Sequence, residues 1–352
     1  MTKKYFDELP PFINRVAETE YINAYLWNAP TSILFIYWPK STGKTTLINK
    51  VINELEQDKY AIQYIDMRWI LLTNFSDFKN IFFPEDLKWK VKEIVSWIKI
   101  NLWFFGWDID DEKAIKTNVF EVMERKLRKA NERWIKPVII LDEFQYLKNI
   151  IIDKENNLLL VEELFKFFIR LTKVNHLAHV ICATSDSYYI EELYNNAKLK
   201  NTSKYYLIDH LEKKDVEYWL WEKEWLNNEI VEYFWGNLWW SVWEIWQCLM
   251  DYKNTGDYKI WVEKLIKDEY AKIFDLYKFR KIFTKEEGKI FKDISKIISK
   301  DWEYITKNWD WLNFELIKKL VDIDVWFYDS IEQKITANSQ TIRKAFEKMF
   351  LN

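Results

Sequence analysis

The stretch Ile33-Leu-Phe-Ile-Tyr37, followed by Trp38-Pro-Lys-Ser-Thr-Gly-Lys-Thr-Thr46, decides the fold of this 352-residue chain. The first five residues form an apolar run, which is typical of a strand buried on both faces. The next eight, Trp38 to Thr45, match the pattern G-x-x-x-x-G-K-[ST], with tryptophan in place of the first glycine. A helix is expected over 45–56. This order predicts a phosphate-binding loop between a strand and a helix.

Each residue type in this loop suits phosphate binding. Gly43 lets the backbone approach the ligand closely, the Lys44 ammonium reaches the outer phosphates, and the Thr45 hydroxyl is a ligand for Mg²⁺. Backbone N–H groups of the loop and of the helix start complete the site. We therefore expect ATP, together with Mg²⁺, to bind at this loop. The residues concerned are Trp38, Pro39, Lys40, Ser41, Thr42, Gly43, Lys44, Thr45 and Thr46.

A second motif, Pro137-Val-Ile-Ile-Leu-Asp142-Glu143, places two carboxylates after four apolar residues. In a doubly wound sheet, ligands bind at the carboxyl ends of the strands. Asp142 is therefore expected to hold Mg²⁺, and Glu143 to polarise the water that attacks the γ-phosphorus. The alternative is an acidic helix start, since carboxylates favour the first turn of a helix. Because the two motifs follow in the correct chain order, we take Lys44 and Glu143 as catalytic residues.

A third, weaker element is Ala178-His-Val-Ile-Cys-Ala-Thr184-Ser185-Asp186. Thr184 and Ser185 are candidates to touch the γ-phosphate or to orient the attacking water, although both residue types are also ordinary helix N-caps. Arg68 and Arg170 are alternatives for a cation at the transition state, or else surface ion-pair residues. The three histidines have no metal-ligand spacing, so a zinc site is rejected.

Tryptophan is unusually frequent and glycine unusually rare, with 21 Trp and 5 Gly in the chain. Average glycine usage is about 7%. Many of the tryptophans stand where turns are expected, and turns disfavour bulky residues. These positions are Trp27, Trp134, Trp225, Trp239, Trp240, Trp302, Trp309 and Trp311.

Our hypothesis is that such positions, including Trp38, are glycines of a gene that uses UGA for glycine. The alternative is a naturally Trp-rich chain whose phosphate loop is degenerate, because the first loop position is a tight turn where a Cβ is costly. Some tryptophans, such as Trp107 or Trp326, are candidates for genuine ones.

The overall composition is that of a globular chain, with 49% hydrophobic and 30% charged residues. A net charge of −3 gives no global argument for nucleic acid or an anionic membrane surface. Cys182 and Cys248 lie in apolar runs, as buried free thiols of a reducing compartment do. The first residues do not resemble a signal peptide, and the apolar stretch 95–107 is too short to span a bilayer. We expect a cytoplasmic protein without a membrane segment.

Strands and helices alternate up to about residue 210, which predicts an α/β fold with a parallel sheet flanked by helices. Strands are expected over 32–37, 60–66, 138–141, 178–183 and 204–208. Helices are expected over 16–26, over 158–172 and over most of 67–135. After this core (1–210) we expect a helical lid (211–278). A small α+β domain (279–352) has the element order of a winged helix, with short strands at 326–329 and 334–337.

These motifs resemble the archaeal-type ATPase family, a branch of P-loop NTPases related to the AAA+ and STAND groups. The matching stretches are Phe12-Ile-Asn-Arg15, 32–47, 137–147, 178–193 and 204–216. The resemblance implies that Asn14 and Arg15 lie near the adenine and that a winged-helix region ends the chain. Trp38 departs from the family pattern.

The favoured function is an ATP-binding and ATP-hydrolysing switch or motor, in which the lid and the C-terminal region respond to the γ-phosphate. A DNA-binding regulator is a second class, although residues 280–352 carry only 14 Lys/Arg against 12 Asp/Glu. A nucleotide-independent interaction protein is a third, if Trp38 blocks the loop. A protein partner or DNA could bind the C-terminal domain, and the oligomeric state is left open.

Overall fold

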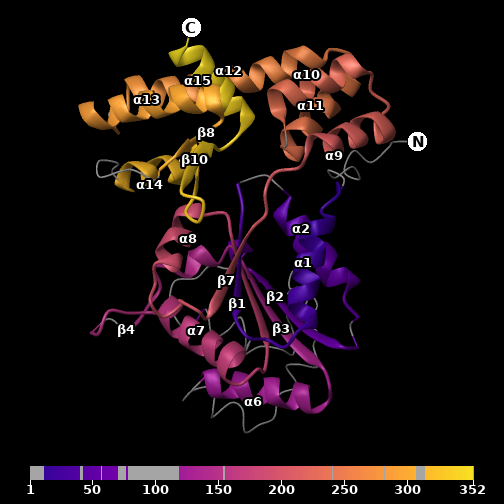
Figure 1. Ribbon diagram of the computed structural model, residues 1–352, viewed down its shortest axis with the longest axis vertical. Coiled ribbons are helices and arrows are strands. Elements are labelled where there is room, and N and C mark those ends of the chain that lie inside the picture. Colours follow the sequence, from indigo (N-terminus) through magenta and orange to yellow (C-terminus); the bar gives the residue numbers. More distant parts are fainter. Residues whose placement is uncertain are drawn as a thin grey trace.

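The computed structural model describes residues 12–39, 43–56, 58–69, 77, 119–153, 155–239, 241–280, 282–306 and 314–351. Figure 1 shows an α/β core at one end of the molecule and two mainly helical groups at the other. Most of the predicted helical stretch 67–135 lies outside the described residues. Its last part is the helix α6 (Val119–Glu132).

The core is built on a five-stranded, all-parallel sheet with the strand order β2-β3-β6-β1-β7. The predicted α/β class with a parallel sheet is confirmed. All five predicted strands are present, each within two residues of its expected ends. They are β1 (Ile33–Tyr37), β2 (Tyr60–Asp66), β3 (Lys136–Asp142), β6 (His179–Thr184) and β7 (Ser203–Leu207).

Alternate residues of β1 enter two different cores, which explains its unbroken apolar run. Phe35 faces one cluster, beneath α7 (Leu160–Ile169) and α8 (Ser187–Tyr194), while Ile36 faces the other, beneath α1 (Val16–Trp27) and α2 (Lys44–Glu54). Figure 1 shows these two helix pairs on opposite sides of the sheet.

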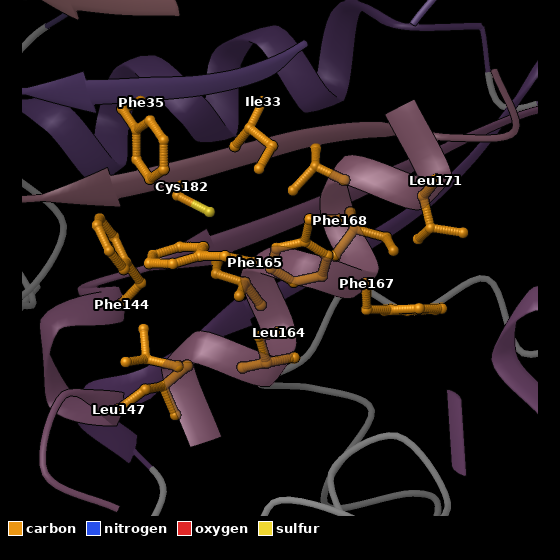
Figure 2. Close-up of a cluster of buried hydrophobic side chains, with 14 of the residues drawn as sticks. Ile33, Phe35, Phe144, Leu147, Leu164, Phe165, Phe167, Phe168, Leu171 and Cys182 are labelled. Carbon is orange, nitrogen blue, oxygen red and sulfur yellow. The ribbon is translucent and has the colours of Figure 1, made fainter. Parts of the chain in front are cut away.

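Several aromatic rings lie in the cluster under α7, and Figure 2 shows five of them, Phe35, Phe144, Phe165, Phe167 and Phe168, among aliphatic side chains. The Phe144 ring lies 5.6 Å from that of Phe35 and 5.2 Å from that of Tyr189, measured between centroids. Phe144 is almost fully buried, so it fixes the chain directly after the Asp142-Glu143 pair.

The predicted helix over 158–172 is partly wrong. Leu158 and Leu159 form the short strand β5, which pairs with β4 (Ile151–Asp153) in a hairpin that projects from the core. The helix α7 starts only at Leu160, and the chain continues as a π-helical turn over Arg170–Val174. An apolar run of this kind fits either a strand or a buried helix face, so periodicity alone does not place its start.

The second helical group comprises four elements around a single apolar cluster that includes Phe234, Leu238 and Val262. These elements are α9 (Lys213–Tyr218) with its π-helical continuation Trp219–Lys223, α10 (Asn228–Leu238), α11 (Val242–Thr255) and α12 (Tyr258–Lys278). The far end of α12, at Ile273 and Leu276, joins the next cluster instead. The division into 1–210, 211–278 and 279–352 stays a prediction.

The C-terminal residues form three helices around a three-stranded antiparallel sheet, with the strand order β8-β10-β9. The two predicted strands occur with the expected bounds, and β8 was not predicted. In chain order the elements are α13 (Lys285–Asp301), β8 (Glu303–Ile305), α14 (Phe314–Asp322), β9 (Trp326–Asp329), β10 (Lys334–Ala337) and α15 (Gln340–Phe350).

The β9–β10 hairpin packs on the α/β core beside the end of β1. Phe327 belongs to the same apolar cluster as Phe35. The Tyr37 hydroxyl donates to the Asp329 carboxylate at 3.2 Å, and the backbone N–H of Tyr328 donates to the Ser187 hydroxyl at 3.4 Å. These contacts join the last domain to the strand that precedes the phosphate loop.

Four of the described tryptophans have left-handed backbone conformations, in which a bulky side chain is an outlier. Their φ angles are 62° at Trp134, 58° at Trp225, 50° at Trp239 and 72° at Trp302. Gly256, at the end of α11, also has a positive φ angle, of 76°. This is the backbone geometry that the glycine hypothesis requires at helix ends. Trp38 is not among the positive-φ residues, and Trp326 lies in a regular strand.

Cys182 and Cys248 are both free and buried. Among the described residues, no helix combines the length and apolar character needed to cross a membrane.

Candidate nucleotide-binding site

A cavity of about 830 Å³ opens where β1, β3 and β6 end, at the carboxyl edge of the sheet. Ligands of doubly wound sheets bind at this edge. The core contributes Trp38, Gly43, Lys44, Thr45, Thr46, Arg68, Glu143, Gln145, Tyr146, Ser185 and Asp186 to its lining. The chain start adds Phe12, Ile13 and Arg15, the second helical group adds Leu211, Val242 and Trp243, and the C-terminal domain adds Val321, Asp322 and Asp324.

Thr45, which lines the cavity, contacts Asp142, which is buried behind the lining; the two residues come from different strand–helix units. The Thr45 hydroxyl donates to Asp142 Oδ2 at 3.2 Å, and the Tyr64 hydroxyl donates to the same oxygen at 2.9 Å. Asp142 is fully buried, and burial raises its pKa, while the nearby Lys44 ammonium opposes that shift. The predicted pairing of the loop threonine with the acidic strand end is therefore present.

The side chain of Lys44 lies between the two carboxylates. Its Nζ atom is in ion-pair contact with Glu143 and lies 3.5 Å from Asp142 Oδ1. Burial lowers the pKa of Lys44 to about 8, and the Asp142 carboxylate opposes that shift. The lysine thus neutralises Asp142, the last residue of β3, and Glu143, which follows it.

Glu143 is held in a strained conformation by three side chains. Its φ angle is 55°, in the left-handed region. Besides Lys44, its carboxylate accepts hydrogen bonds from the Ser185 hydroxyl at 2.9 Å and from the Gln145 amide at 2.5 Å. A non-glycine residue in this region is a recognised sign of a functional site.

Thr184 and Ser185 take different positions. Ser185 touches Glu143 directly, whereas the Thr184 hydroxyl donates to the Gln145 side chain at 2.7 Å and also caps the backbone N–H of Asp186 at 3.0 Å. Thr184 is fully buried, so it reaches the site through Gln145.

A second acid lies beside Asp142. Asp66, at the end of β2, pairs in register with Asp142 and accepts from Arg68 through Nε at 2.9 Å and Nη2 at 2.5 Å. Arg68 Nη2 also lies 3.2 Å from the Thr45 hydroxyl and 3.6 Å from Asp142 Oδ2. Arg68 therefore belongs to the site. Arg170 does not line the cavity and pairs with Glu124 at 2.9 Å.

Arg15 and Asn14 lie in different surroundings, and only Arg15 lines the cavity. Arg15 is buried and lines the cavity, where its guanidinium contacts Glu18 at 2.6 Å and donates to the Asp209 carbonyl at 2.5 Å. Asn14 is exposed, is not among the lining residues, and donates to Asp215 at 2.7 Å. A position of either residue near an adenine stays a prediction.

Trp38 is packed inside the cavity wall. Only 1% of it is exposed, and the Lys44 Nζ atom lies 4.8 Å from the centroid of its ring. Pro39 is also buried but is not among the lining residues. Lys40, Ser41 and Thr42 lie outside the described residues. The indole thus occupies space beside the ammonium group that is expected to meet phosphate.

The residues present fit a magnesium ion. Thr45 and Asp142 supply a hydroxyl and a carboxylate, which are the hard oxygen ligands that Mg²⁺ takes in proteins, with further ligands from phosphate and water. The two oxygens already lie 3.2 Å apart.

Three contributors were not predicted from sequence: Tyr64, Asp66 and Gln145. Tyr64 and Asp66 lie in β2, whose alternating pattern marks a strand but not what its end faces. Gln145 follows Glu143 by two residues, and that proximity was the only available signal.

The strand order, the loop between β1 and α2, and the acid pair at the end of β3 define a P-loop nucleoside triphosphatase fold. The chain belongs to a family of ATPase domains found predominantly in Archaea, whose pattern it matches over residues 12–235. The family to which the sequence motifs pointed is confirmed.

Relatives agree with this placement. An uncharacterized ATP-binding protein of Methanocaldococcus jannaschii is 35% identical over 335 residues, which are 93% of this chain and 96% of the relative. A second such protein of the same organism is 40% identical over 229 residues, 63% of each chain.

Solved structures share the fold. A Walker-type ATPase of Pyrococcus abyssi superposes with a TM-score of 0.63 at 15% identity, covering 96% of both chains. The ORC2 protein of Aeropyrum pernix gives a TM-score of 0.50 at 11% identity, covering 98% of this chain and 96% of that one.

Proposed function

We propose that this chain is a molecular switch that binds ATP with Mg²⁺, hydrolyses it, and changes the placement of its C-terminal domain as it does so. The observation that carries the proposal is that one cavity is walled by three parts of the chain. The phosphate loop supplies Lys44, the second helical group supplies Val242, and the C-terminal domain supplies Asp322. A ligand in such a cavity contacts all three parts, so its phosphates can favour one arrangement over another.

The first step is an exchange of partners at Lys44. In the absence of nucleotide its ammonium group contacts Glu143 and Asp142. A bound triphosphate carries more negative charge, so the ammonium moves its contacts to the phosphate oxygens and Glu143 is released. When bound, Mg²⁺ would neutralise the charge of the phosphate oxygens, and Thr45 and Asp142 are the residues that would hold it.

The second step uses Glu143 as the general base. Ser185 and Gln145 contact its carboxylate, and Thr184 contacts Gln145. Once Lys44 turns to phosphate, these two bonds keep the carboxylate at the cavity, where it accepts a proton from the attacking water. Phe144 anchors the backbone directly behind it.

The third step concerns the C-terminal wall. Asp322 and Asp324 line the same cavity as Lys44. A triphosphate placed between them and Lys44 adds negative charge beside these two carboxylates, which disfavours the closed placement of α14 and the β9–β10 hairpin. Opening would break the Tyr37–Asp329 hydrogen bond, at 3.2 Å, and the hydrogen bond from Tyr328 N–H to Ser187, at 3.4 Å.

The experiment measures binding and movement in the same sample. Both native thiols are buried, so cysteines introduced at the exposed positions Glu132 and Lys300 can be labelled selectively with a donor and an acceptor dye. ATP with Mg²⁺ is expected to change energy transfer between the labels, and the Lys44→Ala variant is expected to show no change. Binding of ATP without a change in transfer would contradict the switch, and failure to bind would contradict the whole proposal.

A further inference from the structure

Arg68 places a positive charge where a divalent ion is expected. Its Nη2 atom lies 3.2 Å from the Thr45 hydroxyl and 3.6 Å from Asp142 Oδ2, the two oxygens that fit a magnesium ion. The same nitrogen and Nε both donate to Asp66. One planar group therefore contacts oxygens of Asp66, Asp142 and Thr45, which come from the ends of β2 and β3 and from the start of α2.

The anchoring of Arg68 is specific. Asp66 is largely buried and also accepts the backbone N–H of Arg68 at 3.0 Å, so the loop and the side chain are fixed to the same carboxylate. A guanidinium that donates through two nitrogens to one carboxylate is held in a defined plane. About two fifths of the side chain (41%) is exposed, and Arg68 lines the cavity. A ligand in the cavity can therefore reach the guanidinium while Asp66 still contacts it.

Charge balance explains why an arginine is useful here. Asp66, Asp142 and Glu143 gather three carboxylates, whereas Lys44 and Arg68 bring two cations. A divalent ion near Thr45 and Asp142 neutralises the carboxylates that Arg68 otherwise neutralises. The ion and the guanidinium also repel each other, because both are positive. Arg68 then either withdraws toward Asp66 or turns to a phosphate oxygen.

We propose that Arg68, anchored by Asp66, is a positioning residue that holds Thr45 and Asp142 in place of the divalent ion and yields to Mg²⁺ when nucleotide binds. This inference rests on the proposed function. If Arg68 has this role, its effect on nucleotide affinity changes sign with the presence of Mg²⁺. Arg68 supports binding when the ion is absent and competes with the ion when it is present.

The test titrates Mg²⁺ against a fluorescent ATP analogue bound to the full chain and repeats the measurement in EDTA. In Arg68→Gln, half-saturation is expected at an about tenfold lower Mg²⁺ concentration, the size of one charge–charge interaction at a partly exposed site. Binding in EDTA is expected to weaken by a similar factor. Arg68→Lys keeps the charge but not the two-nitrogen contact, so its values should lie between those of Arg68→Gln and the unmodified chain. Arg170→Gln, a matched exposed arginine that does not line the cavity, should match the unmodified chain.

The outcomes separate this inference from the function on which it rests. If the unmodified chain binds no analogue with or without Mg²⁺, both fail. If it binds but Arg68→Gln leaves the Mg²⁺ half-saturation unchanged, the inference alone is overturned. A lower turnover with an unchanged Mg²⁺ dependence would assign Arg68 to the phosphate only, which also overturns it. Melting temperatures of the variants show whether each one is folded.

Discussion

The ammonium group of Lys44 is in ion-pair contact with the carboxylate of Glu143 at a site that water hardly reaches. Asp142 Oδ1 lies 3.5 Å from the same nitrogen. A lysine that neutralises two buried acids supports the fold as well as the ligand, so its removal has two separable consequences.

Lys44→Ala is expected to abolish tight ATP binding and also to lower the stability of the ligand-free chain by about 3 kcal/mol. The loss arises because an uncompensated charge is left in the interior. Urea unfolding without nucleotide measures the second effect, and the ATP-induced rise in melting temperature measures the first.

Two further variants isolate the cause. Lys44→Ala combined with Glu143→Gln removes one of the stranded charges and should recover a large part of the lost stability. Lys59→Ala, at an exposed lysine just before β2, should leave stability almost unchanged. ATP binding that survives in Lys44→Ala would show that the nucleotide binds elsewhere.

Glu143→Gln is expected to keep ATP binding and to lose turnover by a factor of about 10² to 10⁴, the usual contribution of a general base. The amide oxygen can still accept from Ser185, so the geometry is retained while the basicity is lost. Phosphate release at saturating ATP is the measurement. Glu192→Gln, on the exposed side of α8, is the control. Equal turnover in Glu143→Gln and the unmodified chain would show that Glu143 is not the general base.

The sequence predicts what depends on local pattern and on chain order. The apolar runs before Trp38 and Asp142 mark buried parallel strands, and residues of both strand ends do meet at one sheet edge. The ends of α7 and the strand β5 were missed because Leu158 and Leu159 suit either structure. Contacts between neighbouring strands, such as the hydrogen bond of Tyr64 with Asp142, depend on strand register and on side-chain direction. The spacing of residues along the sequence predicts neither of these.

The stability of this chain is expected to fall as pH rises through neutrality because of Glu244. Burial raises the pKa of this α11 carboxyl to about 7, while a hydrogen bond from Thr341 at 3.1 Å opposes the shift and the nearby Glu269 adds to it. A carboxyl whose pKa is raised on folding contributes stability below its unfolded pKa, and that contribution is lost as pH rises through the folded value.

From pH 5 to pH 8 the loss attributable to Glu244 is about 3 kcal/mol at most, from the size of the shift. Glu244→Gln should be more stable than the unmodified chain at pH 8, and its unfolding free energy should change less over this range. Urea unfolding at several pH values checks this, with the exposed Glu303→Gln as control. Parallel pH profiles for Glu244→Gln and the unmodified chain would contradict it.

Glycine in place of Trp134 or Trp225 is expected to raise stability by about 1 kcal/mol for each change. Both have φ near 60°, where a Cβ costs about 1–2 kcal/mol, and they are 92% and 85% exposed, so little packing is lost. Trp261→Gly is the contrasting variant, since Trp261 lies inside α12 with helical geometry and packs against the apolar cluster of the second helical group. That change should destabilise by about 1 kcal/mol or more. Destabilisation by all three changes would count against the glycine hypothesis, and mass spectrometry of native peptides decides it directly.

Trp38→Gly is expected to separate folding from ligand binding. The indole is buried in the apolar cluster that also contains Leu47 and Ile208, so its loss should destabilise the ligand-free chain by about 3–5 kcal/mol, as removal of a large core side chain does. The same change clears the space beside Lys44 and lets loop N–H groups approach phosphate.

One added hydrogen bond to a charged phosphate contributes about 1.5–3 kcal/mol, so ATP should bind roughly tenfold to a hundredfold more tightly in Trp38→Gly. Trp38→Gly is therefore expected to have a lower melting temperature than the unmodified chain without nucleotide, but a larger rise in melting temperature when ATP is added. Trp38→Phe, which keeps a large ring, should show neither gain. If Trp38→Gly bound ATP more weakly than the unmodified chain, the indole would be a contributor to the site rather than an obstacle, and residue 38 would be a genuine tryptophan with a binding role.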